Sequence, residues 1–278
     1  MGGAIVRGVV RAGLLPAAAI AAVDSDASKL AALATLGVAA TTDLAAAIAA
    51  ARPDAAVLVA VKPQSFAALA GVLASSRWSR QGPVVSIMAG LSTTAIAAAI
   101  DGPDGASSGG AGGVRVIRVM PNLPVSVGMG MSALCSGNRA TSEDLALAER
   151  IFATLGQTIR IEERLMDAFT ALAGSGPAYL FYLAQAMRNA GESLGFDATT
   201  ADAVVRATLR GSAELLATSP ATSAEALRAG VTSQGGTTAA ATAVLDEAGV
   251  IDSFVRAITA ARDRSVELAA LAAPSAPR

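Results

Sequence analysis

Over its first ~160 positions the chain alternates short apolar runs with stretches of helical periodicity of about ten residues. The apolar runs predict strands at residues 19–23, 38–40, 56–61, 84–88, 114–120, 131–135 and 158–161. The periodic stretches predict helices at residues 3–12, 27–36, 43–51, 65–74, 93–100 and 142–155. Because this alternation is typical of βαβ units on a parallel sheet, we expect an open, doubly wound α/β domain of the Rossmann-like class.

The pattern changes twice along the chain. Residues 101–113 are mostly Gly, Ser, Asp, Pro and Ala, which predicts a mobile surface loop between a helix and a strand. After residue 161 the strand signals stop, and helices are predicted at residues 163–192, 198–217, 223–228, 238–248 and 251–271. We therefore expect a dinucleotide-binding domain at residues 1–162 and an all-helical domain at residues 163–278. Helical segments such as residues 178–183 are apolar around much of their circumference, which favours packing between copies of the chain.

Composition narrows the chemistry. The 278 residues include 21 Lys and Arg against 22 Asp and Glu with no basic run, so we expect no nucleic-acid partner. No histidine is present, which removes histidine bases, histidine-containing triads and histidine metal sites, and we expect no metal. The lone Cys135 reads as a core residue of a protein kept in a reducing cytoplasm. Arg7 and Arg11 before an apolar run imitate a signal peptide, but a helix followed by a strand fits the continuing pattern better, and no run approaches the ~18 residues of a membrane span.

Three predicted strand ends carry unusual residues, and ligands of open parallel sheets bind at strand ends. Pro63 stops one strand and leaves Lys62 at the predicted crevice, although a solvated lysine on a turn is an equally good reading. Residues 88–90, Met-Ala-Gly, are followed by Leu91 and Ser92, and this segment includes small residues that let a ligand approach the backbone. Residues 118–124 contain two prolines that fix the chain as it leaves the sheet.

Two glycine-rich segments stand out in the helical half. Gly174 and Gly176 interrupt a helical run at a cost of ~1 kcal/mol each, which indicates close approach to that backbone or tight helix packing. Residues 232–238, Thr-Ser-Gln-Gly-Gly-Thr-Thr, lead into a helix. Their free N–H groups and hydroxyls predict an anion site, most simply for a carboxylate, with plain helix capping as the alternative.

Taken in order, the motifs Ala-Val-Lys-Pro-Gln at 60–64, Met-Pro-Asn at 120–122, Asp-Ala-Phe-Thr-Ala-Leu-Ala-Gly-Ser-Gly-Pro-Ala-Tyr at 167–179 and the loop at 232–238 resemble pyrroline-5-carboxylate reductase. The likeness covers nearly the whole chain. It implies NAD(P)H-dependent reduction of 1-pyrroline-5-carboxylate to L-proline, with NADPH favoured and NADH possible. It also implies a helical dimerisation domain, dimers that assemble further, and an active site that uses both subunits.

The resemblance also assigns residues. It places the substrate carboxylate on Ser233, Gly235, Gly236, Thr237 and Thr238, with the Thr238 hydroxyl nearest the imine nitrogen as the candidate catalytic group. The cofactor would be lined by Gly2, Asp24, Ser25, Ala60, Val61, Lys62, Pro63, Ile87, Met88, Ala89, Met120, Pro121 and Asn122. An acid at Asp24 suits ribose hydroxyls, whereas Ser25, Ser28 and Lys29 suit a 2′-phosphate.

Departures from the family leave other readings open. Family members open with a strand and a Gly-x-Gly-Asn-Met-Gly turn, but this sequence starts at Met1, so that Gly2 can only be the third glycine. We expect weak cofactor binding and an exposed strand edge in the chain as given. Leu123 and Gln234 stand where Thr and Pro are usual, and Ala229 and Gly230 where polar residues are common. A non-catalytic dimeric relict remains an alternative; a β-hydroxyacid-type dehydrogenase is less favoured, because no lysine follows Lys62.

Overall fold

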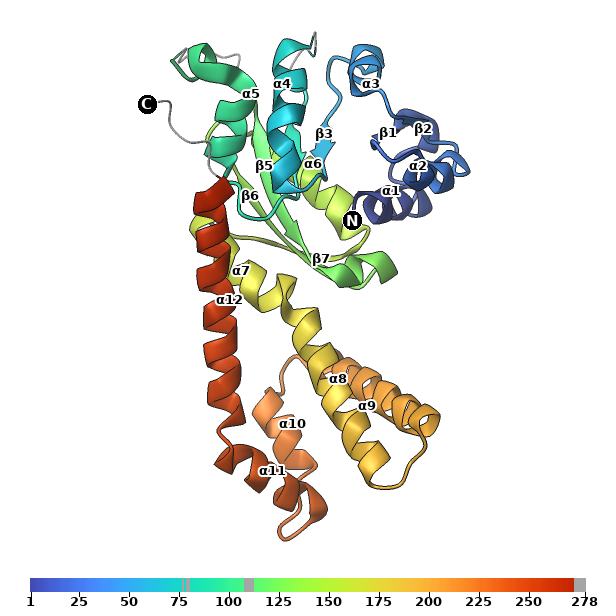
Figure 1. Ribbon diagram of the computed structural model, residues 1–278, viewed down its shortest axis with the longest axis vertical. Coiled ribbons are helices and arrows are strands. Elements are labelled where there is room, and N and C mark those ends of the chain that lie inside the picture. Colours follow the sequence, from blue (N-terminus) through green and yellow to red (C-terminus); the bar gives the residue numbers. More distant parts are fainter. Residues whose placement is uncertain (77, 79–80, 108–112, 273–278) are drawn as a thin grey trace. The chain divides into compact units, whose positions relative to one another are not determined.

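The computed structural model describes residues 1–76, 78, 81–107 and 113–272, which form two compact units (Figure 1). The first unit contains Met1–Ser175 and Ala261–Arg278, and the second contains Gly176–Ala260. The strands are β1 Ala21–Val23, β2 Ala39–Thr41, β3 Val57–Val59, β4 Val84–Ser86, β5 Val116–Pro121, β6 Gly130–Ser136 and β7 Gly156–Arg160. The α-helices of the first unit are α1 Gly2–Arg11, α2 Ala27–Ala34, α3 Leu44–Ala50, α4 Phe66–Ser75, α5 Thr93–Ser107, α6 Ser142–Ala153 and α7 Met166–Phe169.

The main sheet has five strands in the order β3-β4-β5-β6-β7. β3, β4 and β5 are parallel, as predicted, but β6 runs antiparallel to β5, with Arg118 opposite Cys135. The expectation of a wholly parallel sheet was wrong here. The connection from β5 to β6 holds only the short 3₁₀ helix Leu123–Val127, which is too short for the crossover that a parallel strand needs.

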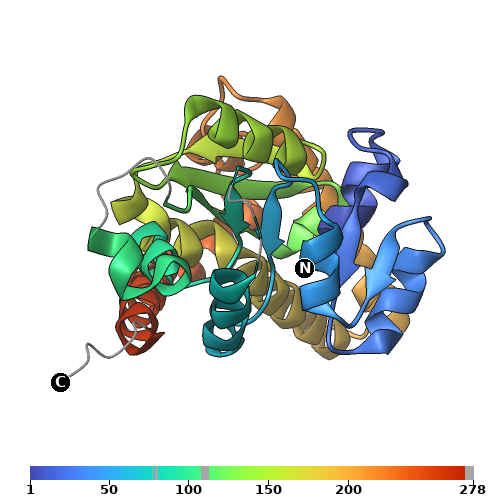
Figure 2. The ribbon, with the colours of Figure 1, turned by 90° about the horizontal axis from the view of Figure 1, so that it is seen from above.

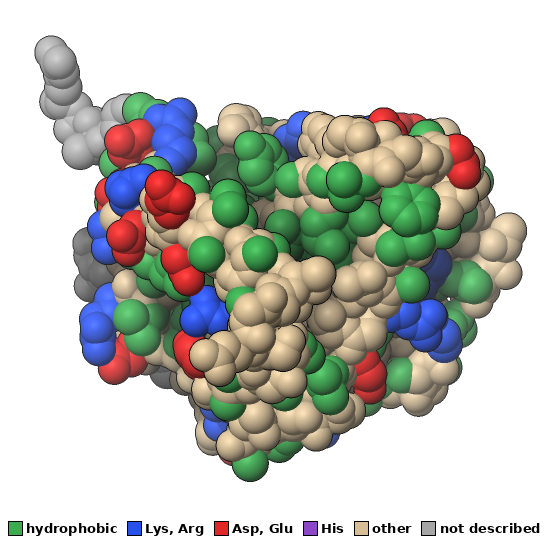
Figure 3. Space-filling view, turned by 90° about the horizontal axis from the view of Figure 1, so that it is seen from below, with side chains coloured by type: hydrophobic (Ala, Val, Ile, Leu, Met, Phe, Trp, Pro, Cys, Tyr) green, Lys and Arg blue, Asp and Glu red, His purple; other side chains and the backbone are tan. Residues whose placement is uncertain are grey.

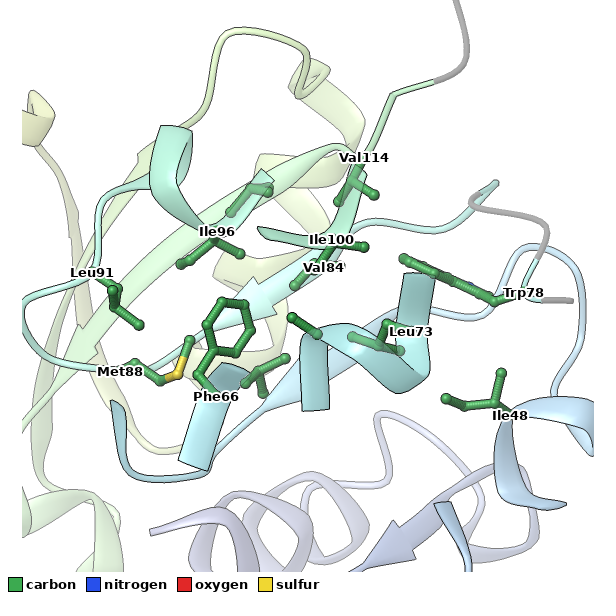
Figure 4. Close-up of a cluster of buried hydrophobic side chains, with 13 residues drawn as sticks. Ile48, Phe66, Leu73, Trp78, Val84, Met88, Leu91, Ile96, Ile100 and Val114 are labelled. Carbon is green, nitrogen blue, oxygen red and sulfur yellow. The ribbon is translucent and has the colours of Figure 1, made fainter. Parts of the chain in front are cut away.

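Helices cover both faces of the main sheet, with α6 on one side and α4 and α5 on the other (Figure 2). Alternate strand residues point to opposite faces, so Val84 joins Phe66 and Ile96 in one buried cluster (Figure 4), while its neighbour Val85 joins Phe152 in another. The two-sided burial confirms the doubly wound α/β class.

β1 and β2 form a separate two-stranded parallel sheet. Helix α1 contacts both sheets, because Ile5 and Val9 lie in the core of the main sheet while Val6 and Val10 pack against the cluster of Ala22 and its neighbours. In the described parts of the chain no strand pairs with the outer edge of β3 or joins β1 to it. β3 is thus the end strand of the main sheet, and its residues are nevertheless half-buried or buried.

Two predictions for the connecting segments need correction. Residues 101–107 are helical, not a loop: α5 continues past a break at Gly102, where φ is +72°, and Pro103 suits the first turn of the new helical segment. Residues 108–112 of the predicted loop lie outside the described residues.

The predicted helix at 163–192 is also divided. A 3₁₀ turn at Glu163–Leu165, helix α7 and a π-turn at Thr170–Gly174 precede the next long helix. The π-turn is closed by the N–H of Ser175, which donates to the carbonyl of Thr170 five residues earlier at 2.8 Å.

The second unit is helical, as predicted. It contains α8 Gly176–Ser193, α9 Ala198–Thr218, α10 Ala224–Gly230, α11 Thr237–Glu247 and the first half of α12 Val250–Ala272. The rings of Tyr179 and Phe254 meet edge to face at 6.5 Å and join α8 to α12. Apolar side chains nevertheless remain exposed, Phe181 to 61% and Tyr182 to 75%, and hydrophobic side chains reach the surface on the face shown in Figure 3.

Candidate active site

Three parallel strands bring the predicted cofactor residues to one edge of the main sheet. The segments Ala60–Pro63, Ile87–Ala89 and Met120–Asn122 all lie at or directly after the carboxyl ends of β3, β4 and β5. In open α/β sheets this edge is where ligands bind. The sequence prediction that these segments share one edge is consistent with the strand pairing.

The N-terminus of α1 lies against the end of β3. A Cβ added to Gly2 would come 3.1 Å from the Cβ of Ala60, so a side chain at residue 2 would crowd this junction. Helix α1 begins without a side-chain cap and has no acidic residue in its first turn. Its unpaired N–H groups and the positive end of the helix suit a phosphate, so the residues present fit the pyrophosphate of a dinucleotide.

Asp24, the acidic residue that follows β1, already has a hydrogen-bond partner and an ion-pair partner within the chain. Asp24 accepts a hydrogen bond from the N–H of Asp26 at 2.9 Å, and the Nζ of Lys29 lies 3.5 Å from the same oxygen. The hydroxyl of Ser28 donates to Asp26 at 2.6 Å. Asp24 is thus paired with the lysine that would receive a 2′-phosphate, and Ser25 is exposed beside them.

The loop after β4 could contact a cofactor through its backbone more than through its side chains. The side chain of Met88 is buried in the cluster with Phe66 (Figure 4), so only the backbone of this residue could line the predicted cofactor crevice. Ala89 is exposed, and Gly90 has φ of +77°. The Cα of Ala269 in α12 lies 3.4 Å from the Cβ position of Gly90, so a side chain there would be both strained and crowded.

The segment after β5 is held by the π-turn. The amide of Asn122 donates to the carbonyl of Ala173 at 3.2 Å and accepts from the N–H of Met131 at 2.9 Å. A Cβ at Gly174 would lie 2.9 Å from the Cε of Met120, so the close approach expected at this glycine is confirmed. A Cβ built at Gly176 would meet no atom of the described residues within 4 Å, so the single chain shows no close approach at this glycine.

A polar cluster that sequence reasoning missed lies behind the same edge. The carboxylate of Glu163 accepts from the N–H and the hydroxyl of Thr93, both at 2.7 Å, and lies 3.4 Å from the guanidinium of Arg118. Arg118 and Thr93 are buried. The sequence offered one weak signal, because Arg118 is a charged residue inside an apolar strand. Its partner could not be predicted, because Glu163 lies 45 positions away along the chain.

Cys135 faces this cluster from β6. Burial raises the pKa of its thiol to about 12, and the nearby Glu163 carboxylate adds to the shift. The thiol is buried and free, which confirms the reading of Cys135 as a core residue.

In the helical unit, the glycine-rich loop leads into the uncapped helix α11. A side chain caps each of α2, α3, α6, α9 and α10, but none caps α11, whose N-cap residue is Gly236. The first helical bond is donated by Ala240 to the carbonyl of Gly236, so the N–H groups of Thr237, Thr238 and Ala239 have no acceptor one turn earlier. This geometry suits a carboxylate.

One predicted donor in this loop is wrong. The N–H of Gly236 donates to the carbonyl of Ser233 at 3.0 Å, which closes the turn, so it is not free for a ligand. Gly235 has φ of +68° at the turn, a conformation that glycine adopts without strain. A Cβ on Gly236 would lie 2.2 Å from the hydroxyl of Ser233, so this hydroxyl keeps its position only while residue 236 lacks a side chain.

These features define the class of the protein: a dinucleotide-binding α/β oxidoreductase whose second half is a helical unit in which a glycine-rich loop leads into an uncapped helix. The family described as "Pyrroline-5-carboxylate reductase dimerisation" matches residues 163–268, and "NADP oxidoreductase coenzyme F420-dependent" matches residues 1–90.

Individual relatives agree with the family matches. Pyrroline-5-carboxylate reductase of Corynebacterium melassecola is 40% identical over 68% of this chain and 66% of its own. The enzyme of Methanosarcina acetivorans is 34% identical over 96% of this chain and 94% of its own. The solved pyrroline-5-carboxylate reductase of Coxiella burnetii superposes with a TM-score of 0.80 at 31% identity, covering 96% of this chain and 94% of that one. The chain belongs to the pyrroline-5-carboxylate reductase family. No helix within the described ranges is long and apolar enough to cross a membrane.

Proposed function

We propose that the chain catalyses the reduction of 1-pyrroline-5-carboxylate to L-proline with NADPH, and accepts NADH less well. The observation that carries this is the uncapped N-terminus of α11 behind the Ser233–Gly236 turn, which offers backbone N–H groups to an anion in a chain of this family. The curated relatives above carry the name of this reductase, and a solved pyrroline carboxylate reductase of Plasmodium falciparum has NADP bound.

The cofactor residues are proposed on the geometry of the first unit. Gly2 at the start of α1 would receive the pyrophosphate, and the group at Asp24, Ser25 and Lys29 would meet the adenosine ribose. The backbone of the segments at 60–63, 87–89 and 120–122 would line the nicotinamide side. NADPH supplies a hydride when bound.

The substrate side is proposed on the helical unit. The N–H groups of Thr237 and Thr238 would hold the carboxylate, with the hydroxyl of Ser233 as a further donor. Thr238 is half-buried, whereas Thr237 is exposed. We assign the Thr238 hydroxyl the hydrogen bond to the ring nitrogen.

The reaction needs little from the protein in proton transfer. The substrate is a cyclic imine that is readily protonated, so the electrophile is activated before the hydride arrives and the proton stays on the ring nitrogen of the product. A chain without histidine can therefore catalyse the step by orienting the two reactants and stabilising the protonated nitrogen.

The exposed apolar side chains of α8 and α9 support assembly. Phe181, Tyr182 and Val204 are more than half exposed in a single copy of the chain. A patch of this kind marks an interaction surface, and the family match to this region is to a dimerisation domain. We propose a homodimer or a higher homo-oligomer. We also propose a cytoplasmic location, where the free thiol of Cys135 stays reduced.

Replacement of Thr238 tests the catalytic assignment. Thr238→Ala should lower kcat by about 10- to 100-fold, because one hydrogen bond to the charged reacting nitrogen is lost, at about 1.5–3 kcal/mol. Thr238→Ser should restore most of the rate, and Thr237→Ala should change kcat little. The melting temperature controls for folding. A Thr238→Ala variant with wild-type kcat would remove Thr238 from this role.

A further inference from the structure

Glu163 joins two segments that are far apart in sequence. Its Oε1 accepts the N–H of Thr93 and its Oε2 accepts the hydroxyl of the same residue, both at 2.7 Å. Oε1 also lies 3.4 Å from the Nη1 of Arg118. One carboxylate thus holds the first residue of α5 and a side chain of β5.

Both contacts lie close to the cofactor edge. Thr93 directly follows the loop at 87–92, and the hydroxyl of Ser92 already caps the helix by accepting the N–H of Ala95 at 3.1 Å. Arg118 lies two residues before the segment 120–122. Fixing these two residues fixes the backbone of both proposed cofactor segments.

The charge of Glu163 is as important as its hydrogen bonds. The side chain of Arg118 is only 6% exposed, and its Nε is buried with no hydrogen-bond partner among the described residues. In the described part of the chain, the counter-charge of Arg118 is the carboxylate of Glu163, which lies within ion-pair distance of the guanidinium. A buried guanidinium that loses its counter-charge is costly and shifts toward water.

We infer that Glu163 is a positioning residue for the cofactor: it holds the loop after β4 and the end of β5 in the arrangement that binds the dinucleotide. The inference rests on the proposed function, because it requires that this edge binds NADPH. Without the Glu163 carboxylate the two segments sample other arrangements, and the competent fraction falls, which weakens apparent binding in proportion.

Glu163→Gln tests the inference, because glutamine keeps the length of the side chain and removes its charge. We expect the Kd for NADPH, measured by isothermal titration calorimetry, to rise about tenfold, as for loss of one charge-assisted hydrogen bond. The KM for NADPH should rise with it, while kcat at saturating NADPH changes less than about threefold. Glu162→Gln is the matched control: its partner is the surface residue Arg164, both side chains are about 70% exposed, and its Kd should stay at the wild-type value.

A second pair of variants covers the case in which Glu163→Gln does not fold. Thr93→Val removes one of the two hydrogen bonds to Glu163 but leaves the ion pair with Arg118, and should raise the Kd in the same direction. Thr93→Ser keeps the hydroxyl and should restore the wild-type Kd.

Other outcomes separate the alternatives. A Glu163→Gln variant that melts lower but binds NADPH with the wild-type Kd would show a purely structural role and overturn the inference. Wild-type Kd in Thr93→Val would overturn it as well. If the unchanged chain itself bound no NADPH, the proposed function would fail first, and this inference with it.

Discussion

Replacement of Gly236 by alanine tests the proposed binding of the substrate carboxylate by the glycine-rich loop. The backbone of Gly236 has φ of −82° and ψ of 173°, which alanine adopts without strain. Its new Cβ would lie 2.2 Å from the hydroxyl of Ser233 and 3.1 Å from the carbonyl of the same residue. The hydroxyl is the mobile partner, so we expect it to rotate away.

The magnitude follows from the lost hydrogen bond. A hydrogen bond to a charged group contributes about 1.5–3 kcal/mol. At ~1.4 kcal/mol for each factor of ten, KM for pyrroline-5-carboxylate should rise about 10- to 150-fold. The melting temperature should change little, because the loop is exposed and its backbone is unchanged.

The assay is steady-state kinetics on a double-mutant cycle. Ser233→Ala removes the hydroxyl without crowding, so it should raise KM by a similar factor, and the double variant should be no worse than either single variant. Gly230→Ala is the control, since a Cβ there would meet no atom of the described residues within 4 Å. Additive effects, or a large effect of Gly236→Ala beside a silent Ser233→Ala, would refute the steric reasoning.

Two further predictions concern the first unit. Asp144 is buried, pairs with Arg115 at 2.8 Å and accepts the N–H of Thr141, the N-cap residue of α6. Asp144→Ala should therefore lower the free energy of unfolding by about 2–4 kcal/mol in denaturant titrations, while Glu143→Ala at the exposed neighbour should lower it far less. Burial raises the pKa of the Cys135 thiol to about 12, so the folded state holds this proton when the unfolded state has lost it. The contribution of this thiol to the free energy of unfolding is complete below pH ~9 and falls as the pH rises toward 12. A thiol reagent at pH 8 should label Cys135 only after denaturant is added. Labelling of the native protein would contradict the burial of Cys135.

Local pattern was enough to predict most elements of the fold. All seven predicted strands are present with boundaries shifted by a few residues, because each combines an apolar run with a turn signal. The antiparallel direction of β6 was not predicted, since it depends on the short connection after Pro121 and not on the strand itself. The break at Gly102 and the π-turn before Ser175 depend on single residues inside helical patterns.

The candidate site also has one part that local sequence predicts and another part that it does not. The loop at 232–238 could be found from sequence because its glycines and hydroxyl residues are contiguous. The Glu163 contacts to Thr93 and Arg118 could not, because they join residues 70 and 45 positions apart. The engaged N–H of Gly236 was also missed, since a tight turn and an open anion site share the same composition.

The most direct measurement is the oxidation of NADPH, followed by absorbance, on addition of pyrroline-5-carboxylate to the purified chain, with NADH assayed in parallel. We expect substrate-dependent oxidation, faster with NADPH than with NADH, and formation of one proline for each NADPH consumed. A folded chain that binds NADPH but consumes none in the presence of pyrroline-5-carboxylate would contradict the proposed activity and favour a non-catalytic member of the family.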